Sequence, residues 1–236
     1  MGATSGVPAL TRRARPVLVG AVLVAAGIMA FGLPRIGPTN AWRRVPDVTV
    51  VSPAGDQRLP VVGEAVDFWN RTLYQEGTSF RLGTVDRVIG ELPDADLQAL
   101  SEANTWGAWL STRTLRGAWL RQHPAPFDPF PGDLLIVLSD AKFVSFASRI
   151  GDRRLVAIKN AQVRPLTMPN VLRNVIAHEL GHAIGLEHNS DPTTLMCGRP
   201  APCRPDIYAS DTPHFFPLTE ADRDRLRRLY PAVWTP

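Results

Sequence analysis

The sequence predicts an α+β domain over residues 46–236, preceded by an N-terminal segment of different character. Two kinds of pattern alternate along the chain. Short apolar runs have the length of β-strands, whereas longer segments repeat apolar residues at the spacing of an amphipathic helix. The hydrophobic fraction is 44% and the charged fraction is 20%. These values are typical of a folded globular protein and exclude a disordered chain.

The N-terminal 45 residues are predicted to target the protein to a membrane. Three arginines within residues 12–15 precede an uncharged, mostly apolar run over residues 17–33. Arginines on the near side keep that end in the cytoplasm, so the bulk of the chain is expected to be extracytoplasmic. We expect the run to remain as a single anchoring helix. In the alternative, cleavage after Ala41 would release a secreted protein.

The positive net charge does not indicate a nucleic-acid partner. The chain has a net charge of +4, but residues 1–44 hold six arginines and no acidic residue. The remaining residues hold 20 basic and 22 acidic side chains, a net charge of −2. The excess of basic residues lies beside the apolar run, so the predicted membrane-targeting segment accounts for it. We therefore expect no nucleic-acid binding.

The domain is expected to begin with a strand, a helix and a second strand. Residues 47–52 (DVTVVS) are rich in valine and threonine, which favour strands. Residues 60–74 repeat apolar side chains close to helical spacing, which predicts an amphipathic helix. Residues 79–88 are expected to form the second strand. Asp94 is expected to cap a short helix that ends near Ala103.

Three tryptophans follow this short helix: Trp106, Trp109 and Trp119. Large aromatic side chains most often pack in a core, so we expect them to contact the core directly or as a lid on it. In the alternative, they form a platform for substrate. Residues 124–132 contain four prolines and are expected to form a loop.

The second half of the domain is expected to contain two further strands and a long helix. Residues 133–139 (DLLIVLS) read as a buried strand, and residues 155–159 (LVAIK) as another. Asn170 is a candidate N-cap for a helix that runs to about residue 184, where Gly185 would end it.

A loop and a final helix complete the predicted domain. Residues 189–217 are rich in proline, serine and threonine, which predicts a loop. Thr219 is expected to cap an amphipathic helix that turns Leu226 and Leu229 inward and its arginines outward.

Three histidines have the spacing of a catalytic zinc site. His178 and His182 are four residues apart, so on a helix they lie on one face, one turn apart. Gly185 allows a sharp turn because glycine tolerates positive φ, and His188 can then return to the same ion. Three neutral imidazoles leave the fourth tetrahedral position open for water, as catalytic zinc sites do. We therefore predict one catalytic Zn²⁺ ion.

Glu179 is the predicted general base. It lies next to His178 and projects about 100° around the helix from it, so it can face the water without binding the metal. A carboxylate there can take a proton from the attacking water and pass it to a leaving amine. A chance surface motif is the alternative, but three of the five histidines in the chain fall in this segment. The other two, His123 and His214, have no ligand spacing and are expected at the surface.

The segment from His178 to His188 follows the pattern His-Glu-x-x-His-x-x-Gly-x-x-His, which is the metzincin signature. Within that clan the sequence most resembles the matrixins. Met196 matches their Met-turn, an apolar floor beneath the metal, and residues 218–222 resemble the start of their C-terminal helix. The resemblance covers residues 154–231. It implies a zincin-like α+β fold with a twisted mixed sheet, three main helices and a cleft across the zinc, and it implies peptide or protein substrates.

The chain also departs from the matrixin pattern. Its two cysteines, Cys197 and Cys203, follow the active site, so neither is placed to block the zinc from a propeptide. A second, structural zinc site and calcium sites are not evident. We expect the two cysteines to form a disulfide, since export permits one, rather than remain as free thiols. Residues 197–203 replace a wall of the family's substrate pocket, so substrate preference cannot be transferred.

Three functions could use such a zinc site. The first is a zinc endopeptidase, and the second is a catalytically silent zinc-bearing domain that binds peptides or partners at the cell envelope. The third is a membrane-anchored scaffold with structural zinc, against which the open coordination position argues. Glu179 favours the first, because a binding domain has no use for a base beside the water.

Overall fold

Five strands form one mixed β-sheet in the spatial order β2-β1-β3-β5-β4. They are β1 (Val48–Ser52), β2 (Val85–Ile89), β3 (Leu134–Leu138), β4 (Phe146–Ile150) and β5 (Arg153–Ile158). The structure is a computed structural model and describes residues 1–2, 41–105 and 111–233, of which those from Ala41 onward belong to one compact unit. Neighbouring strands are parallel, except that β4 pairs with β5 in the antiparallel sense.

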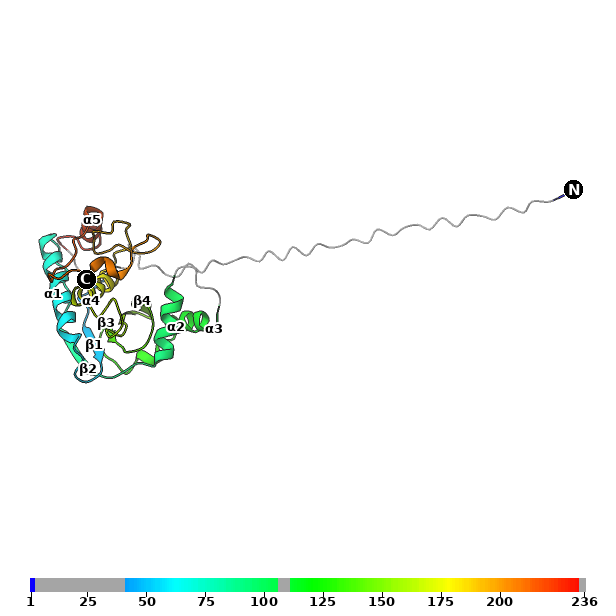
Figure 1. The fold of residues 1–236 in the computed structure, drawn as a ribbon, viewed down its shortest axis with the longest axis horizontal. Coiled ribbons are helices and arrows are strands. Elements are labelled where there is room, and N and C mark those ends of the chain that lie inside the picture. Colours follow the sequence, from blue (N-terminus) through cyan, green and yellow to red (C-terminus); the bar gives the residue numbers. More distant parts are fainter. Residues whose placement is uncertain (3–40, 106–110, 234–236) are drawn as a thin grey trace. The chain divides into compact units, whose positions relative to one another are not determined.

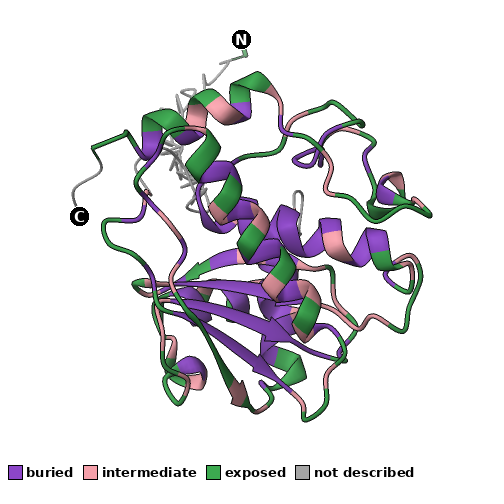
Figure 2. Cartoon of the chain, turned by 90° about the vertical axis from the view of Figure 1, so that its left-hand side faces the viewer, coloured by how far each residue is buried: buried purple, intermediate pink, exposed green. Residues whose placement is uncertain are grey.

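The central strand β3 is apolar throughout because helices cover both faces of the sheet (Figure 2). All five of its residues are buried. Leu134, Ile136 and Leu138 face one hydrophobic core, whereas Leu135 and Val137 face a second core on the opposite side. This alternation follows from the two-residue period of side chains along a strand.

The larger core lies between one face of the sheet and the helices α1 (Leu59–Gln75), α4 (Pro169–Ala183) and α5 (Glu220–Leu229). Trp69 of α1 is fully buried there, and its indole Nε1 donates a hydrogen bond of 2.8 Å to the carbonyl of Ala177 in α4. This contact fixes α1 against the helix that carries the predicted metal ligands.

The smaller core lies on the other face, under the hairpin of α2 (Asp94–Asn104) and α3 (Thr112–Gln122) (Figure 1). The two helices are closely packed, because a Cβ at Gly117 would overlap the backbone of Ala99 and lie 2.7 Å from the Cβ of Ala103. The short 3₁₀ helices Ala125–Phe127 and Pro205–Tyr208 complete the elements of the described chain.

The predicted α+β class is confirmed, and so are most of its elements, but two were missed. Helix α3 and strand β4 were not predicted. The strand expected over residues 79–88 is confined to β2, which starts at Val85. Asn170 is not an N-cap: α4 begins at Pro169 with Met168 as its cap, and Asn170 lies buried inside the first turn.

The expected packing of the tryptophans is wrong for Trp119, whose exposed fraction is 51%. Its ring stacks on that of His123, with centroids 4.6 Å apart. Arg121 and Leu120, not Trp119, are the buried residues at this end of α3. Trp106 and Trp109 lie outside the described residues.

The packed part of the domain extends to Trp42, four residues before the expected start at residue 46. Trp42 is buried, and its indole Nε1 donates to the carbonyl of Ala183 at the end of α4 (3.0 Å). The guanidinium of Arg154 stacks on its ring, 4.1 Å from the centroid. None of the helices in the described ranges is long and apolar enough to cross a membrane. The apolar run over residues 17–33 lies outside those ranges, so the predicted anchor stays a prediction.

Candidate metal centre and active site

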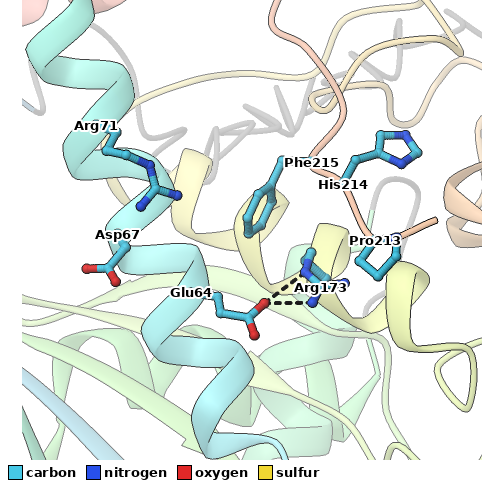
Figure 3. Close-up of a pocket in the computed structure, with 7 residues that line it drawn as sticks. All are labelled: Glu64, Asp67, Arg71, Arg173, Pro213, His214 and Phe215. Atoms are coloured by element: carbon cyan, nitrogen blue, oxygen red, sulfur yellow. Dashed lines mark hydrogen bonds and ion pairs between the residues drawn. The ribbon is translucent and has the colours of Figure 1, made fainter.

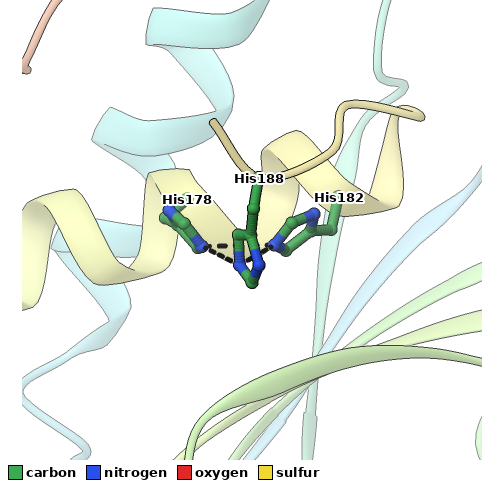
Figure 4. Close-up of side chains that lie close together, drawn as sticks. All are labelled: His178, His182 and His188. Atoms are coloured by element: carbon green, nitrogen blue, oxygen red, sulfur yellow. Dashed lines mark hydrogen bonds between the residues drawn. The ribbon is translucent and has the colours of Figure 1, made fainter. Parts of the chain in front are cut away.

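Helix α4 and the turn that follows it bring three histidines together (Figure 4). His178 and His182 lie one turn apart on α4, as their spacing predicts. Gly185 then adopts φ +104°, a conformation that favours glycine, and the chain reverses so that His188 faces the helix. The Nε2 atom of His178 lies 3.1 Å from that of His182 and 3.1 Å from that of His188, and the third pair is 3.0 Å apart.

A main-chain carbonyl orients each of the three rings. The carbonyl comes from a different part of the chain in each case: Leu195 for His178 (2.7 Å from Nδ1), Leu186 for His182 (2.9 Å) and Arg199 for His188 (2.9 Å). Because a carbonyl only accepts, each Nδ1 must carry the proton, and each neutral ring therefore directs an Nε2 lone pair at the other two. Such an arrangement is repulsive unless a cation lies among the three nitrogen atoms.

The geometry and the protonation state fit a zinc ion. Tetrahedral coordination with Zn–N distances of ~2.0–2.1 Å implies nitrogen atoms about 3.3–3.4 Å apart, only slightly more than those observed. Burial, together with the neighbouring charge of His188, lowers the pKa of His178 to about 4. Burial also lowers the pKa values of His182 and His188. The rings are thus neutral near pH 7, which is the form that binds metals.

Glu179 lies beside the histidines at the outer edge of the sheet. It is buried, and its carboxylate accepts a hydrogen bond from the backbone N–H of Ala147 in β4. Burial raises the pKa of Glu179 to about 8, although this hydrogen bond acts in the opposite direction. A divalent cation at the three imidazoles would lower the pKa again. Ala147 had not been predicted as a site residue, because β4 itself was missed.

Met196, the predicted Met-turn residue, packs against α4 at Gly181, between the first two histidines. It is fully buried, and a Cβ at Gly181 would lie 2.6 Å from its Sδ and 3.0 Å from Cζ2 of Trp69. The absence of a side chain at position 181 thus lets the methionine and the tryptophan pack directly beneath α4.

Tyr208 supports the centre and was missed in the sequence. Its hydroxyl donates to the carbonyl of Leu195 (2.5 Å), which also accepts from His178, and lies 3.3 Å from Nδ1 of that histidine. Burial, and then the nearby charge of Glu179, raise the pKa of Tyr208. The only sequence signal for it was an aromatic residue within a loop rich in proline, serine and threonine.

The two cysteines and the two histidines outside the motif also lie where the sequence predicts. Cys197 and Cys203 form the expected disulfide. His123 and His214 lie at the surface, as expected, away from the metal centre.

A separate cavity of about 280 Å³ lies between α1, α4 and residues 213–215 (Figure 3). Glu64 and Arg173 form an ion pair in its wall. None of the predicted site residues lines this cavity, so the metal centre is a different place on the molecule.

The mixed sheet, the histidine-bearing helix and the turned third imidazole define a metzincin-type zinc domain. Comparison with known families gives the narrower assignment. Residues 111–231, just over half of the chain, match the family model described as Matrixin. The chain therefore belongs to the matrixin family, which confirms the resemblance seen in the sequence, and its cofactor is zinc.

Two known proteins are similar in sequence to parts of the domain. The first is "Probable matrix metalloproteinase 095L" of Invertebrate iridescent virus 3, 43% identical over 74 residues, which cover 28% of this chain and 17% of that protein. The second is "Matrix metalloproteinase-27" of Tupaia belangeri, 39% identical over 56 residues, which cover 24% of this chain and 9% of that protein. The chain thus matches less than a fifth of the length of either relative.

Two solved structures are similar at low identity. Archaemetzincin from Methanopyrus kandleri has a TM-score of 0.41 and 17% identity, over 78% of this chain and 94% of that chain. A zinc-dependent peptidase from Methanocorpusculum labreanum (strain Z) has a TM-score of 0.34 and 12% identity, over 76% and 99%. Both TM-scores lie below 0.5, so neither structure adds to what the sheet and helices of this chain establish.

Proposed function

We propose that this chain is a zinc-dependent endopeptidase with His178, His182 and His188 as metal ligands and Glu179 as general base. The observation that carries the proposal is the convergence of three neutral imidazoles beside a buried carboxylate. Membership of the matrixin family supports it. Zinc, when bound, supplies a Lewis acid that polarises the substrate carbonyl and lowers the pKa of water.

Glu179 is suited to move the proton in this reaction. Its buried carboxylate is adjacent in the chain to one ligand and takes no part in the histidine cluster, so it is free to accept a proton from the attacking water. The same group then returns the proton to the leaving amine.

The edge of β4 is the proposed binding surface for an extended peptide. In the described part of the chain, β4 pairs only with β5, so its outer edge has main-chain groups available for another strand. Ala147 lies in this strand, and its N–H bonds to the carboxylate of Glu179. A peptide added as a strand there would therefore pass close to the general base.

Cleavage of an unfolded protein such as casein by the full-length chain tests the proposal. Glu179→Gln keeps an oxygen to accept from Ala147 but removes the base, so we expect zinc content to be retained and the cleavage rate to fall by about 10²–10⁴-fold. Glu187→Gln is the matched control. It makes the same change of charge at an exposed carboxylate that pairs with Arg225 (2.9 Å), and it should leave the rate unchanged.

The alternative is a catalytically silent zinc-bearing domain that binds peptides or partners. If the zinc-loaded wild type binds peptides but cleaves none, this alternative is favoured and the peptidase proposal is wrong. Equal cleavage rates in the wild type and in Glu179→Gln would instead remove Glu179 from the mechanism.

We further propose that the domain works outside the cytoplasm, anchored by residues 17–33 or released after cleavage. The disulfide between Cys197 and Cys203 supports this location, because disulfides persist in oxidising compartments. A reporter enzyme that is active only after export, fused after residue 45, should be active. An inactive but intact fusion would contradict the proposal. The mass of the mature chain distinguishes an anchor from a cleaved signal.

A further inference from the structure

We propose that the disulfide loop (residues 197–203) positions His188 for metal binding and thereby sets the zinc affinity of the centre. The inference rests on the three histidines being the metal site of the proposed function, but it concerns affinity for the metal and not peptide cleavage. Nothing in the matrixin resemblance supplies it, because this loop is where the chain departs from that family.

His188 depends on outside support more than the other two ligands do. His178 and His182 are held by a regular helix, whereas His188 lies in a segment without helix or strand structure and is the most exposed of the three. Beyond the other two imidazoles, its ring has one hydrogen-bond partner in the described chain, the carbonyl of Arg199 at 2.9 Å from Nδ1. The direction of its Nε2 is therefore set by the disulfide loop.

The first arm of the loop, residues 197–198, packs directly on His188. A Cβ at Gly198 would overlap the imidazole ring, so the loop backbone lies in van der Waals contact with the ligand. This arm is tied to the residue after His188: Gly198 N donates to the carbonyl of Asn189 (3.2 Å), and Asn189 N donates to the carbonyl of Met196 (2.9 Å). These bonds place the start of the loop but do not hold its tip.

The disulfide holds the second arm of the loop, residues 201–203. Ala201 N donates to the carbonyl of Gly198 (3.1 Å), which closes a turn with Arg199 at its tip. Within the described chain, the hydrogen bonds of residues 201–203 reach only Gly198 and Arg204. Cys203 is buried and bonded to Cys197, so this covalent link returns the second arm to the first. Without it, the carbonyl of Arg199 would be free to leave the ring.

Zinc affinity of the full-length chain, measured by competition with a chromophoric chelator, tests the proposal. Removal of a group that orients a ligand typically costs about 10–100-fold in metal affinity. We expect a loss in this range for the double variant Cys197→Ser/Cys203→Ser. Ala54→Ser is the control, because it introduces a serine at an exposed position in the turn before α1, outside the disulfide loop and the metal centre. Its affinity should equal that of the wild type.

A double-mutant cycle separates positioning from general loosening of the fold. In a His188→Ala background, the two serine substitutions should cause no further loss of zinc affinity, since the ligand that they misplace is absent. An equal loss with and without His188 would overturn the proposal, and so would unchanged affinity in the double serine variant.

A second variant keeps the test informative if the serine protein does not fold. Gly198→Ala leaves the disulfide intact but places a methyl group in the space of the His188 ring, so it should also weaken zinc binding by about 10-fold or more. Wild-type affinity in this variant would refute the contact. If the affinities respond as expected but no peptide is cut, the loop inference stands and the peptidase proposal fails.

Discussion

Gly181→Ala tests the packing that lies under the metal centre. Gly181 lies in α4 between the first two ligands, and an added Cβ would be 2.6 Å from Sδ of Met196 and 3.0 Å from Cζ2 of Trp69. Both neighbours are fully buried, so neither can move aside into solvent. We expect this substitution to destabilise the protein, although the same change is favourable in most helices.

The expected magnitude follows from two opposing effects. Replacing glycine by alanine inside a helix stabilises by about 1 kcal/mol. Overpacking a full core by one methyl group costs about 1–3 kcal/mol. Gly63 of α1 isolates the first effect, because a Cβ there has no neighbour within 4 Å. Gly63→Ala should therefore gain up to about 1 kcal/mol, and the two variants should differ by about 1–3 kcal/mol.

Urea unfolding of both variants, with a chelator present so that zinc does not contribute, measures this difference. For a domain of this size, about 1 kcal/mol corresponds to roughly 2–4 °C in Tm. In a parallel thermal melt, the Tm of Gly63→Ala should lie above that of the wild type. The Tm of Gly181→Ala should lie below that of Gly63→Ala by at least roughly 2–4 °C. Equal stabilisation in the two variants would show that Met196 and Trp69 do not pack against position 181.

Three further expectations concern the cap of α5, a buried carboxylate and the metal. Thr219→Ala should lower the free energy of unfolding by about 1 kcal/mol, because the Thr219 hydroxyl accepts from the N–H of Asp222 (3.1 Å); unchanged urea unfolding would contradict this. Burial would raise the pKa of Asp56, but hydrogen bonds from Arg58 outweigh it and lower the pKa. The resulting stability is present above the unfolded pKa near 4 and is lost as pH falls through the lower folded value. Asp56→Asn should therefore be destabilising at pH 7, and its difference from the wild type should shrink as pH falls below 4; a pH-independent difference would contradict the assignment. Chelation should lower Tm, and zinc at 100 times its Kd should restore about 2.7 kcal/mol while magnesium does not; a Tm indifferent to zinc would contradict the site.

The metal ligands could be predicted because their geometry is local. Two positions four apart on a helix, one glycine and a third histidine lie within eleven residues, and the φ of +104° at Gly185 is the conformation that this spacing requires. Tyr208 and Ala147 could not be found in this way. Their contacts to the centre depend on how a distant loop and the edge strand pack against α4.

Helix α3 and strand β4 were missed for different physical reasons. Helix α3 is highly charged and contains Gly117, which opposes a helix locally but is needed for the close approach to α2. Ser111 gives the one local signal, since its hydroxyl accepts from the N–H of Thr114 (3.1 Å) and caps the helix. Strand β4 is short, but the glycine at Gly151 between it and β5, with φ +56°, marks a hairpin that the sequence could have revealed.

The three metal ligands differ in how firmly the fold holds their side chains in place. His188 is held least firmly by the core, so it is the adjustable part of the centre. Helix α4 is fixed on both sides, by Trp69 at Ala177 and by Trp42 at Ala183, so two imidazoles are in place wherever the core is formed. The third imidazole follows a glycine turn and takes its direction from a loop outside the core. The disulfide therefore acts where the hydrophobic core cannot, and the departure from the matrixin pattern in residues 197–203 falls on the ligand that most needs a separate support.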